Sequence, residues 1–291
     1  MSGFQAWRDA SSERNSTEQR ERDICAGGRS CGTDQPRLRR HPHPCQHRQR
    51  PLTPLISPDA EPRTCATLYS VESTWHSEDK VREYVSRVGR LEARRQGEAE
   101  LVEYLPTHVD RALDLGCGDG RLLELVLNTH HETAEAIGLD DSPPMLELAQ
   151  QRLGHDPRVS IVSHDLSEPL PELGQFDVIV SGFAIHHLEH ERKRRLFAEI
   201  ADALTPGGRF INLEVVQCAT PLLHELFNER IGRVGGDPED IRAGAGEQLE
   251  WMRDAGLIEV DCAWRWRGFA VLIGSAPPPT SPRANASTPS A

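Results

Sequence analysis

The chain of 291 residues has almost no lysine and no long apolar run. Lysine occurs only at Lys80 and Lys193, so nearly all positive charge is arginine. The formal net charge of −12 weighs against nonspecific nucleic-acid binding, because such binding needs a cationic surface that displaces counterions from phosphates. No apolar run reaches the roughly 20 residues of a membrane-spanning helix, and the N-terminus lacks the apolar core of a secretory signal. We therefore expect a cytoplasmic protein without a membrane segment.

Paired cysteines are absent as well. The seven cysteines lie at scattered spacings and their number is odd, so we expect no disulfide framework. Cys25, Cys31 and Cys45, with the histidines between residues 41 and 47, are of zinc-ligand type. Their spacing matches no common zinc motif. We predict no metal site.

Residues 1–70 differ in composition from the rest of the chain. They contain 11 Arg, no Lys and 8 acids, a balance of +3 that leaves −15 for residues 71–291. Few residues in this segment are apolar, so it cannot bury enough surface to offset the entropy lost on ordering. We predict a disordered tail, or a mis-assigned start, over 1–70 and a folded domain over 71–275. A second disordered tail, rich in Pro, Ser and Thr, is predicted over 276–291.

The folded part alternates short apolar segments with amphipathic ones. The short segments predict strands over 112–115, 136–140, 159–163, 176–181, 209–216, 257–264 and 268–275. Helices are predicted over 120–128, 142–152, 189–204, 221–234 and 247–255, with one or two more over 77–104. Ser142 is the predicted N-cap of the helix that begins at Pro143.

This alternation is typical of an α/β fold with a doubly wound, mostly parallel sheet of seven strands. The apolar, β-branched composition of the central segments predicts strands that are buried on both faces. The last two strands are separated only by the short turn 265–267. A parallel crossover needs a dozen or more residues, so the last strand must be antiparallel.

A glycine-rich loop follows the first predicted strand, in the sequence ALDLGCGDGRLL of residues 112–123. Gly116, Gly118 and Gly120 leave this turn without side chains, so a ligand can lie against the backbone where the next helix presents unpaired N–H groups. Dinucleotide-binding loops have the spacing Gly-x-Gly-x-x-Gly. Here Arg121 stands at the third glycine position, which argues against NAD or FAD. A tight turn without a ligand is the alternative.

Acidic residues follow the second and third predicted strands. Asp140 and Asp141 end the segment 136–141, where a carboxylate can accept both hydrogen bonds of a ribose diol. For Asp141, a favourable interaction with the N-terminus of the next helix is the alternative role. Asp165 follows the segment 159–163 in the same way.

With these residues, the chain from about 75 to 275 resembles the class I S-adenosylmethionine-dependent methyltransferases. The resemblance implies that the glycine loop, with Cys117, lies beneath the methionine part of the cofactor, and that Asp114 positions its ammonium or a water bound to it. It assigns Asp140 to the ribose, with Asp141 beside it. Asp165 and the Leu166 backbone are assigned to the adenine, and Met145 either to the adenine side or to the core.

The segment Ser181–Leu188 follows the strand whose carboxyl end should meet both cofactor and substrate, and Ser181 is predicted to bind the cofactor. Methyl transfer requires alignment of the nucleophile and, where it is protonated, removal of its proton. His186 and His187 can titrate near neutrality and are candidate bases; a packing role is the alternative. Methyltransferases that act on DNA carry Asn/Asp-Pro-Pro-Tyr/Phe or Pro-Cys here, and this segment matches neither.

Substrate recognition is predicted for the N-terminal helices, for residues 217–246 and for the Trp-rich end. Trp251, Trp264 and Trp266, with Arg265 and Arg267, are candidates for an aromatic and cationic wall that suits an anionic or planar substrate. The alternative is that Trp251 and Trp264 are core residues. Trp75 is a candidate cap over the cofactor.

These observations predict a methyltransferase that moves a methyl group from S-adenosylmethionine to an O, N or C atom of a small molecule. An enzyme that modifies the wobble uridine of tRNA is the first alternative. A regulatory protein that binds the cofactor without catalysis is the second. The sequence indicates neither the acceptor atom nor the oligomeric state.

Overall fold

The computed structural model describes residues 74–279. The predicted tail over 1–70 lies outside these residues, as does most of the tail predicted over 276–291. None of the described helices has the length and apolar composition of a membrane-spanning helix.

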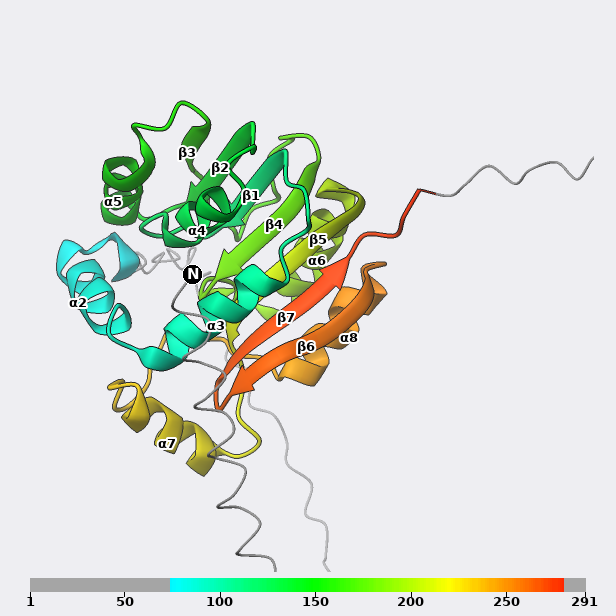
Figure 1. The fold of residues 1–291 in the computed structure, drawn as a ribbon. Coiled ribbons are helices and arrows are strands. Elements are labelled where there is room, and N and C mark those ends of the chain that lie inside the picture. Colours follow the sequence, from blue (N-terminus) through cyan, green and yellow to red (C-terminus); the bar gives the residue numbers. More distant parts are fainter. Residues whose placement is uncertain (1–73, 280–291) are drawn as a thin grey trace, which may run out of the picture. The chain divides into compact units, whose positions relative to one another are not determined.

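A seven-stranded sheet forms the centre of the described part (Figure 1). Its strands are β1 (Arg111–Leu115), β2 (Glu135–Asp140), β3 (Val159–Ser163), β4 (Phe176–Gly182), β5 (Leu204–Val215), β6 (Ile258–Trp266) and β7 (Phe269–Ser275). They lie in the order β3-β2-β1-β4-β5-β7-β6. The strands β1 to β5 are parallel, and β7 is antiparallel to both of its neighbours. The predicted fold class, including the antiparallel last strand, is confirmed.

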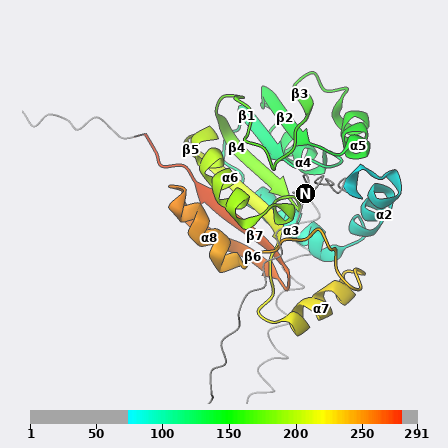
Figure 2. The same ribbon diagram turned by 180° about the vertical axis from the view of Figure 1, so that it is seen from behind.

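Helices cover both faces of the sheet. They are α2 (Glu78–Val88), α3 (Glu92–Glu103), α4 (Arg121–Thr129), α5 (Pro143–Leu153), α6 (His190–Ala203), α7 (Pro221–Arg230) and α8 (Ala245–Asp254), with the short 3₁₀ helices η2 (Thr74–His76) and η3 (Ile185–His187). In Figures 1 and 2, α3 and α4 lie over one face, whereas α6 and α8 lie over the other. As predicted, the Ser142 side chain caps α5 by accepting a hydrogen bond from the Met145 N–H.

The expectation of burial on both faces is wrong for β3. This strand is at the edge of the sheet and pairs only with β2. The chain then reaches β4 through residues 164–175 without a helix, so part of β3 stays uncovered and Val162 is 37% exposed. An apolar, β-branched sequence predicts a strand here, but it cannot tell an edge position from a central one.

The turn between the last two strands lies further along the chain than predicted. Trp266 belongs to β6, and the chain reverses at Arg267 and Gly268. A Cβ atom at Gly268 would come within 2.6 Å of the Phe227 ring of α7, so α7 can pack here only against glycine. The domain also continues past its predicted end at 275, because Ala276 is buried and its N–H donates to the Gly208 carbonyl.

The direction of the side chains on β1 determines on which face of the sheet Asp114 lies. Leu113 and Leu115 pack into the apolar cluster on the α6 and α8 face, whereas Ala112 packs into the cluster on the α4 face. Successive side chains of a strand point to opposite faces. Asp114 therefore lies on the α4 face, at the point where the glycine loop leaves the sheet.

Candidate functional site

The carboxyl ends of the parallel strands border a cavity of about 470 Å³. The glycine loop and the ends of β2 and β4 form one side, and the N-terminal segment η2–α2 forms the opposite side. Of the predicted cofactor residues, the lining includes Asp114, Gly116, Cys117, Gly118, Asp140, Asp141, Met145, Asp165 and Leu166. The prediction brought together residues from three strand ends, and the structure places them around one cavity.

The glycine loop has a backbone that side chains disfavour. Gly116 has φ 68° and Gly118 has φ 54°, in the left-handed region that glycine adopts without cost. A Cβ atom on Gly116 would come within 2.2 Å of the Ala184 Cβ. The loop thus needs glycine for its conformation and for its close approach to the segment after β4. Cys117 is buried against Gly138 of β2, and its backbone N–H donates to the Leu139 carbonyl at 2.8 Å.

Gly120 and Ser181 do not line the cavity, so the structure does not support the prediction that they bind cofactor. Gly120 precedes α4 with φ 79° and packs against α5, where an added Cβ would lie 2.9 Å from a Leu153 methyl group. Ser181 is fully buried, and its hydroxyl donates to the Leu115 carbonyl at 2.8 Å. Both residues join elements that support the site.

Asp114 is a buried carboxyl group at the edge of the cavity. It is 1% exposed, and neither of its oxygens makes a hydrogen bond of normal geometry with the described residues. Burial, and next the charge of Asp140, raise the pKa of Asp114 to about 8, although the Leu123 backbone N–H partly opposes this. Buried polar groups are nearly always paired, so this carboxyl is suited to a cationic or hydrogen-bonding ligand group.

Asp140 holds the loop and the start of α5 together. One carboxylate oxygen accepts from the Gly118 N–H at 2.8 Å, and the other accepts from the Ser142 N–H at 2.9 Å. Burial raises the pKa of Asp140 despite these hydrogen bonds. Each oxygen keeps a further lone pair, so the carboxylate can still accept from a ligand diol. Asp141 is more exposed and lies 3.5 Å from the His76 imidazole.

Asp165 is exposed, and its carboxylate is already engaged by one neighbour. Its oxygens accept from the Ser167 N–H at 2.8 Å and from the Ser167 hydroxyl at 2.7 Å. Leu166 is buried beside it and lines the cavity. Met145 is 5% exposed and also lines the cavity, so it is both a core residue and part of the wall.

The two candidate bases differ in position, and His186 does not line the large cavity. His186 is 3% exposed, with Nδ1 2.7 Å from Glu214 Oε1 and Nε2 3.4 Å from Asp240 Oδ1. Burial opposes its charge, but the two carboxylates outweigh burial and raise the pKa of His186. Both nitrogens are thus directed at buried acids. The prediction that His186 acts on the acceptor is not supported, because it is a buried ionic link between β5 and the loop at Asp240.

His187 lies on the wall of the cavity. Its Nδ1 is 3.2 Å from the Glu239 carbonyl oxygen. A carbonyl can only accept, so Nδ1 carries the proton and Nε2 is left with a lone pair. Burial and the adjacent His186, whose ring centroid is 4.0 Å away, lower the pKa of His187 to about 3. A neutral imidazole of such low basicity can orient an acceptor but removes protons poorly.

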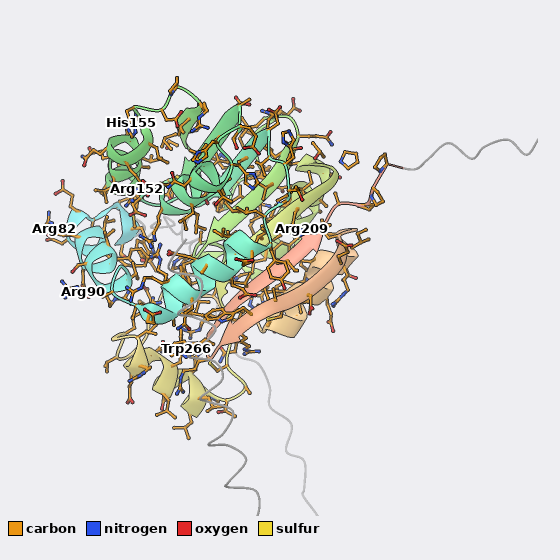
Figure 3. The ribbon with its side chains drawn as sticks, viewed as in Figure 1. Arg82, Arg90, Arg152, His155, Arg209 and Trp266 are labelled. Carbon is orange, nitrogen blue, oxygen red and sulfur yellow. The ribbon has the colours of Figure 1, made fainter. Side chains whose placement is uncertain are left out.

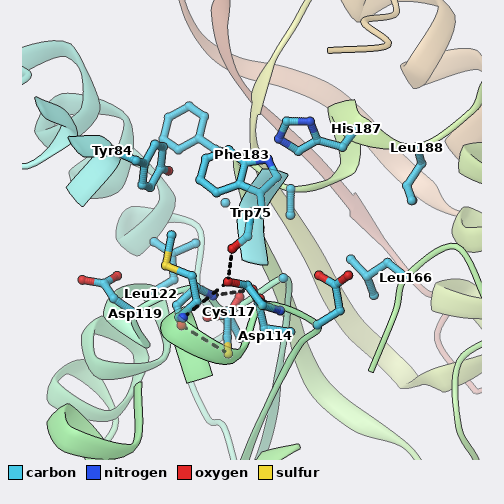
Figure 4. A pocket seen from close by; sticks show the side chains of 18 of the residues that line it. Trp75, Tyr84, Asp114, Cys117, Asp119, Leu122, Leu166, Phe183, His187 and Leu188 are labelled. Atoms are coloured by element: carbon cyan, nitrogen blue, oxygen red, sulfur yellow. Dashed lines mark hydrogen bonds between the residues drawn. The ribbon is translucent and has the colours of Figure 1, made fainter. Parts of the chain in front are cut away.

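The aromatic wall of the cavity comes mainly from residues that sequence analysis missed. Figure 4 shows Trp75, Tyr84 and Phe183 gathered near His187, at the end away from Cys117 and Asp114. The Trp75 and Tyr84 rings meet edge to face with centroids 5.0 Å apart. Trp75 is also tied to α5, because its carbonyl accepts from the Ser142 hydroxyl at 2.6 Å. The predicted position of Trp75 over the site is supported, whereas Tyr84 and Phe183 carry no motif.

The predicted wall of tryptophans and arginines near the end of the chain is wrong. Trp251 and Trp264 pack within the apolar clusters, which is the alternative that the sequence left open. Trp266 lies at the end of β6 (Figure 3), with its ring centroid 6.3 Å from that of Phe227 in α7. None of these three side chains lines the large cavity.

One cluster in the described part has metal-ligating side chains. Atoms of His186, His187 and Asp240 lie within 4.8 Å of one another. Arg233 and Arg242 place guanidinium nitrogens 3.1 Å and 3.0 Å from the Asp240 carboxylate. These charges already neutralise the acid and would repel a dication. The arrangement is that of an ion-pair network, and we assign no metal to it.

The comparisons with known proteins agree with this arrangement. Residues 112–208 match the family model of a methyltransferase domain. An uncharacterized methyltransferase of Anoxybacillus flavithermus is 35% identical over 100 residues, which cover 34% of this chain and 44% of the relative. A trans-aconitate 2-methyltransferase of Methylobacterium nodulans is 32% identical over 154 residues, which cover 53% and 55%. The chain thus spans about half the length of these relatives.

A solved structure of similar fold is an O-methyltransferase family protein from Burkholderia thailandensis. It superposes with a TM-score of 0.58 at 20% identity, covering 72% of this chain and 63% of that one. The strand order and the matches with known proteins show a fold, and a segment over residues 112–208, that are similar to those of methyltransferases.

Proposed function

We propose that this protein transfers a methyl group from S-adenosylmethionine to a small molecule. The observation that carries the proposal is the buried Asp114 carboxyl beside a glycine loop of left-handed backbone. This carboxyl has a pKa raised to about 8 and makes no hydrogen bond of normal geometry with the described residues. An ammonium group against Asp114 would supply the missing donors and offset the cost of burying its charge. The amino-acid part of the cofactor carries such a group.

Two arginines that line the cavity suit the carboxylate of the cofactor. Arg94 and Arg121 share the buried Glu98, with three nitrogen–oxygen distances of 2.7 Å. Two guanidinium groups and one carboxylate leave one net positive charge beside the cavity. With Asp114, this group would recognise a zwitterionic amino acid. We further propose that Asp140 accepts from the ribose and that Leu166, Met145 and Asp165 surround the adenine.

The acceptor needs to be nucleophilic without a strong base from the protein. The sulfonium supplies the methyl group, and the chain contributes alignment of the two reactants. His187 stays neutral at physiological pH and can orient an acceptor through Nε2. Without a strong base, the site favours an acceptor that is already ionised, that is acidic enough to ionise in water, or that is an uncharged amine.

The size and the roof of the cavity favour a small molecule over tRNA. The cavity is roofed by the segment around Trp75, which is hydrogen bonded to Ser142 on the cofactor side. A net charge of −12 also disfavours a long RNA surface. The similarity to a trans-aconitate 2-methyltransferase supports a small acceptor.

Calorimetry with S-adenosylhomocysteine tests the proposal. Asp114→Asn removes the charge and keeps the shape, and we expect it to weaken binding by about 10- to 100-fold, the range for a lost charge-assisted hydrogen bond. Asp156→Asn, which removes an ion pair with Arg158 outside the cavity, is the control and should leave binding unchanged. If the wild-type protein binds neither the cofactor nor its demethylated product at high micromolar concentration, the proposal is wrong.

Transfer of tritium from methyl-labelled cofactor separates the alternatives. We expect label in a small-molecule extract. Label in tRNA alone would favour the RNA-modifying alternative, and tight cofactor binding without transfer to either would favour the regulatory one.

A further inference from the structure

A second, smaller recess adjoins the large cavity on the side of the N-terminal helices. Its volume is about 30 Å³, which is room for a single group of the size of a water molecule or a carboxylate. It shares Trp75, Tyr84, Arg94, Phe183 and His187 with the large cavity. A molecule in the large cavity could therefore extend one small group into the recess.

Basic side chains line this recess. Three arginines, Arg87, Arg94 and Arg233, border it together with His186 and His187, whereas no Asp or Glu among residues 74–279 does. This concentration stands out in a chain whose net charge is −12. Guanidinium groups in a partly buried recess favour an anionic ligand group.

Among the described residues, Arg87 differs from the other two arginines in forming no ion pair, although Glu83 and Asp237 are near enough to favour its charge. Arg94 pairs with Glu98 at 2.7 Å, and Arg233 pairs with Asp237 at 2.8 Å and with Asp240 at 3.1 Å. Among the described residues, the recorded contact of the Arg87 guanidinium is with the Tyr84 ring, at 5.9 Å. Burial, and next the charge of Arg233, lower the pKa of Arg87. An anion at this place would favour the charged form of Arg87 and so offset both effects.

Aromatic rings surround the same opening. Phe183 and Phe269 both line the recess, with centroids 4.9 Å apart. Trp75 and Tyr84 close it from the N-terminal side, and Figure 4 shows Tyr84, Trp75 and Phe183 together at this end of the large cavity. Such walls accommodate a flat, apolar body.

We propose that the methyl acceptor is a planar, largely apolar carboxylic acid whose carboxylate is anchored in this recess by Arg87, with Arg94 and Arg233 adding positive potential. The body of the acid lies between the aromatic rings, and the atom that receives the methyl group lies in the large cavity. This inference rests on the proposed function, because it specifies the acceptor of that reaction.

Binding of simple acids and their uncharged amides tests the anchor. The full chain, saturated with S-adenosylhomocysteine, is titrated with benzoate and benzamide, and with trans-cinnamate and cinnamamide. We expect each acid to bind at least tenfold more tightly than its amide. Arg87→Gln should reduce this ratio to near one, and Arg87→Lys should restore part of it because the charge is retained.

Arg82→Gln is the matched control. Arg82 lies on the same helix α2, its side chain is 70% exposed, and Figure 3 shows it on the outer side of that helix. The control should keep the wild-type ratio of acid to amide affinity. If neither acid binds more tightly than its amide, or if both glutamine variants lower the ratio equally, the inference is wrong. Tight binding of S-adenosylhomocysteine in the same samples would show that the proposed function survives, whereas its absence would mean that the proposed function itself fails.

Discussion

At the scale of single residues, the site depends most on the protonation of Asp114. Its pKa is raised to about 8 from an ordinary value of 3.8, so in the free protein the folded state holds a proton that the unfolded state has already released at neutral pH. The contribution of this group to folding stability is therefore present below about pH 4 and is lost as the pH rises towards 8. A cationic ligand reverses this preference, because it favours the ionised carboxylate.

The affinity for S-adenosylhomocysteine should consequently increase with pH. We expect a rise of up to about tenfold per pH unit below pH 8 and a plateau above it, since the ligand must displace the proton. Calorimetry between pH 6 and 9 in buffers of different ionisation enthalpy measures both the affinity and the proton released. In Asp114→Asn the pH dependence should be absent. A wild-type affinity that does not change over this range would contradict the assignment of Asp114 to the ammonium.

At the scale of elements, the buried His186 joins η3 to β5 and to the loop that carries Asp240. We expect His186→Gln to destabilise the fold by about 3 kcal/mol at pH 6, because it leaves the buried Glu214 carboxylate without its partner, whereas Asp240 keeps Arg233 and Arg242. The pKa of His186 is raised in the folded state, so its contribution is complete below about pH 6.5 and is lost as the pH rises through the folded value. The cost of the substitution, measured by urea unfolding, should therefore be smaller at pH 9.

His187→Gln is the control for this prediction. The pKa of His187 is lowered to about 3, so this histidine is neutral in the folded state between pH 6 and 9. The cost of replacing it should change less, and in the opposite direction, because the unfolded state titrates near pH 6.5. Equal pH profiles for the two variants would contradict the ionic role of His186.

Comparison of the predicted elements with the structure shows which parts of the fold and of the cavity could be predicted from the sequence. The alternation of apolar and amphipathic segments was sufficient to predict the fold class. The motif at Gly116 and the acids Asp114 and Asp140 were sufficient to predict residues that line one wall of the cavity, because that wall is formed by strand ends and the loops that follow them. For the opposite wall the sequence indicated only regions, the N-terminal helices and the segment Ser181–Leu188, and it could not single out Tyr84 and Phe183, because these side chains meet only when the chain folds. Likewise, Glu214 and Asp240 lie far from His186 in sequence, so nothing near His186 indicated that its ring would be buried between two acids.

At the scale of the whole described domain, the N-terminal segment bridges two sides of the large cavity. The Ser142 hydroxyl of the cofactor side donates to Trp75, and the Thr74 N–H donates to Glu239 at 3.0 Å on the other side. Lys80 adds a 3.3 Å ion pair with Asp237 and lies 4.5 Å from the centre of the Trp75 ring. We infer that a ligand beneath this segment leaves when some of these contacts break, in which case they should govern its residence time more than its capture.

Lys80→Gln should therefore shorten the residence time of S-adenosylhomocysteine by several-fold, because the variant loses the ion pair with Asp237 and the contact with the Trp75 ring. The association rate should change little, because the groups around Asp114 stay in place. Stopped-flow displacement measures the dissociation rate. Arg82→Gln, on the outer side of the same helix, should dissociate at the wild-type rate, which separates loss of the bridge from a general loss of positive charge on α2. If Lys80→Gln releases the ligand no faster than the control, the segment does not limit release, and the cavity exchanges its ligand by a route that leaves the contacts of Trp75 intact.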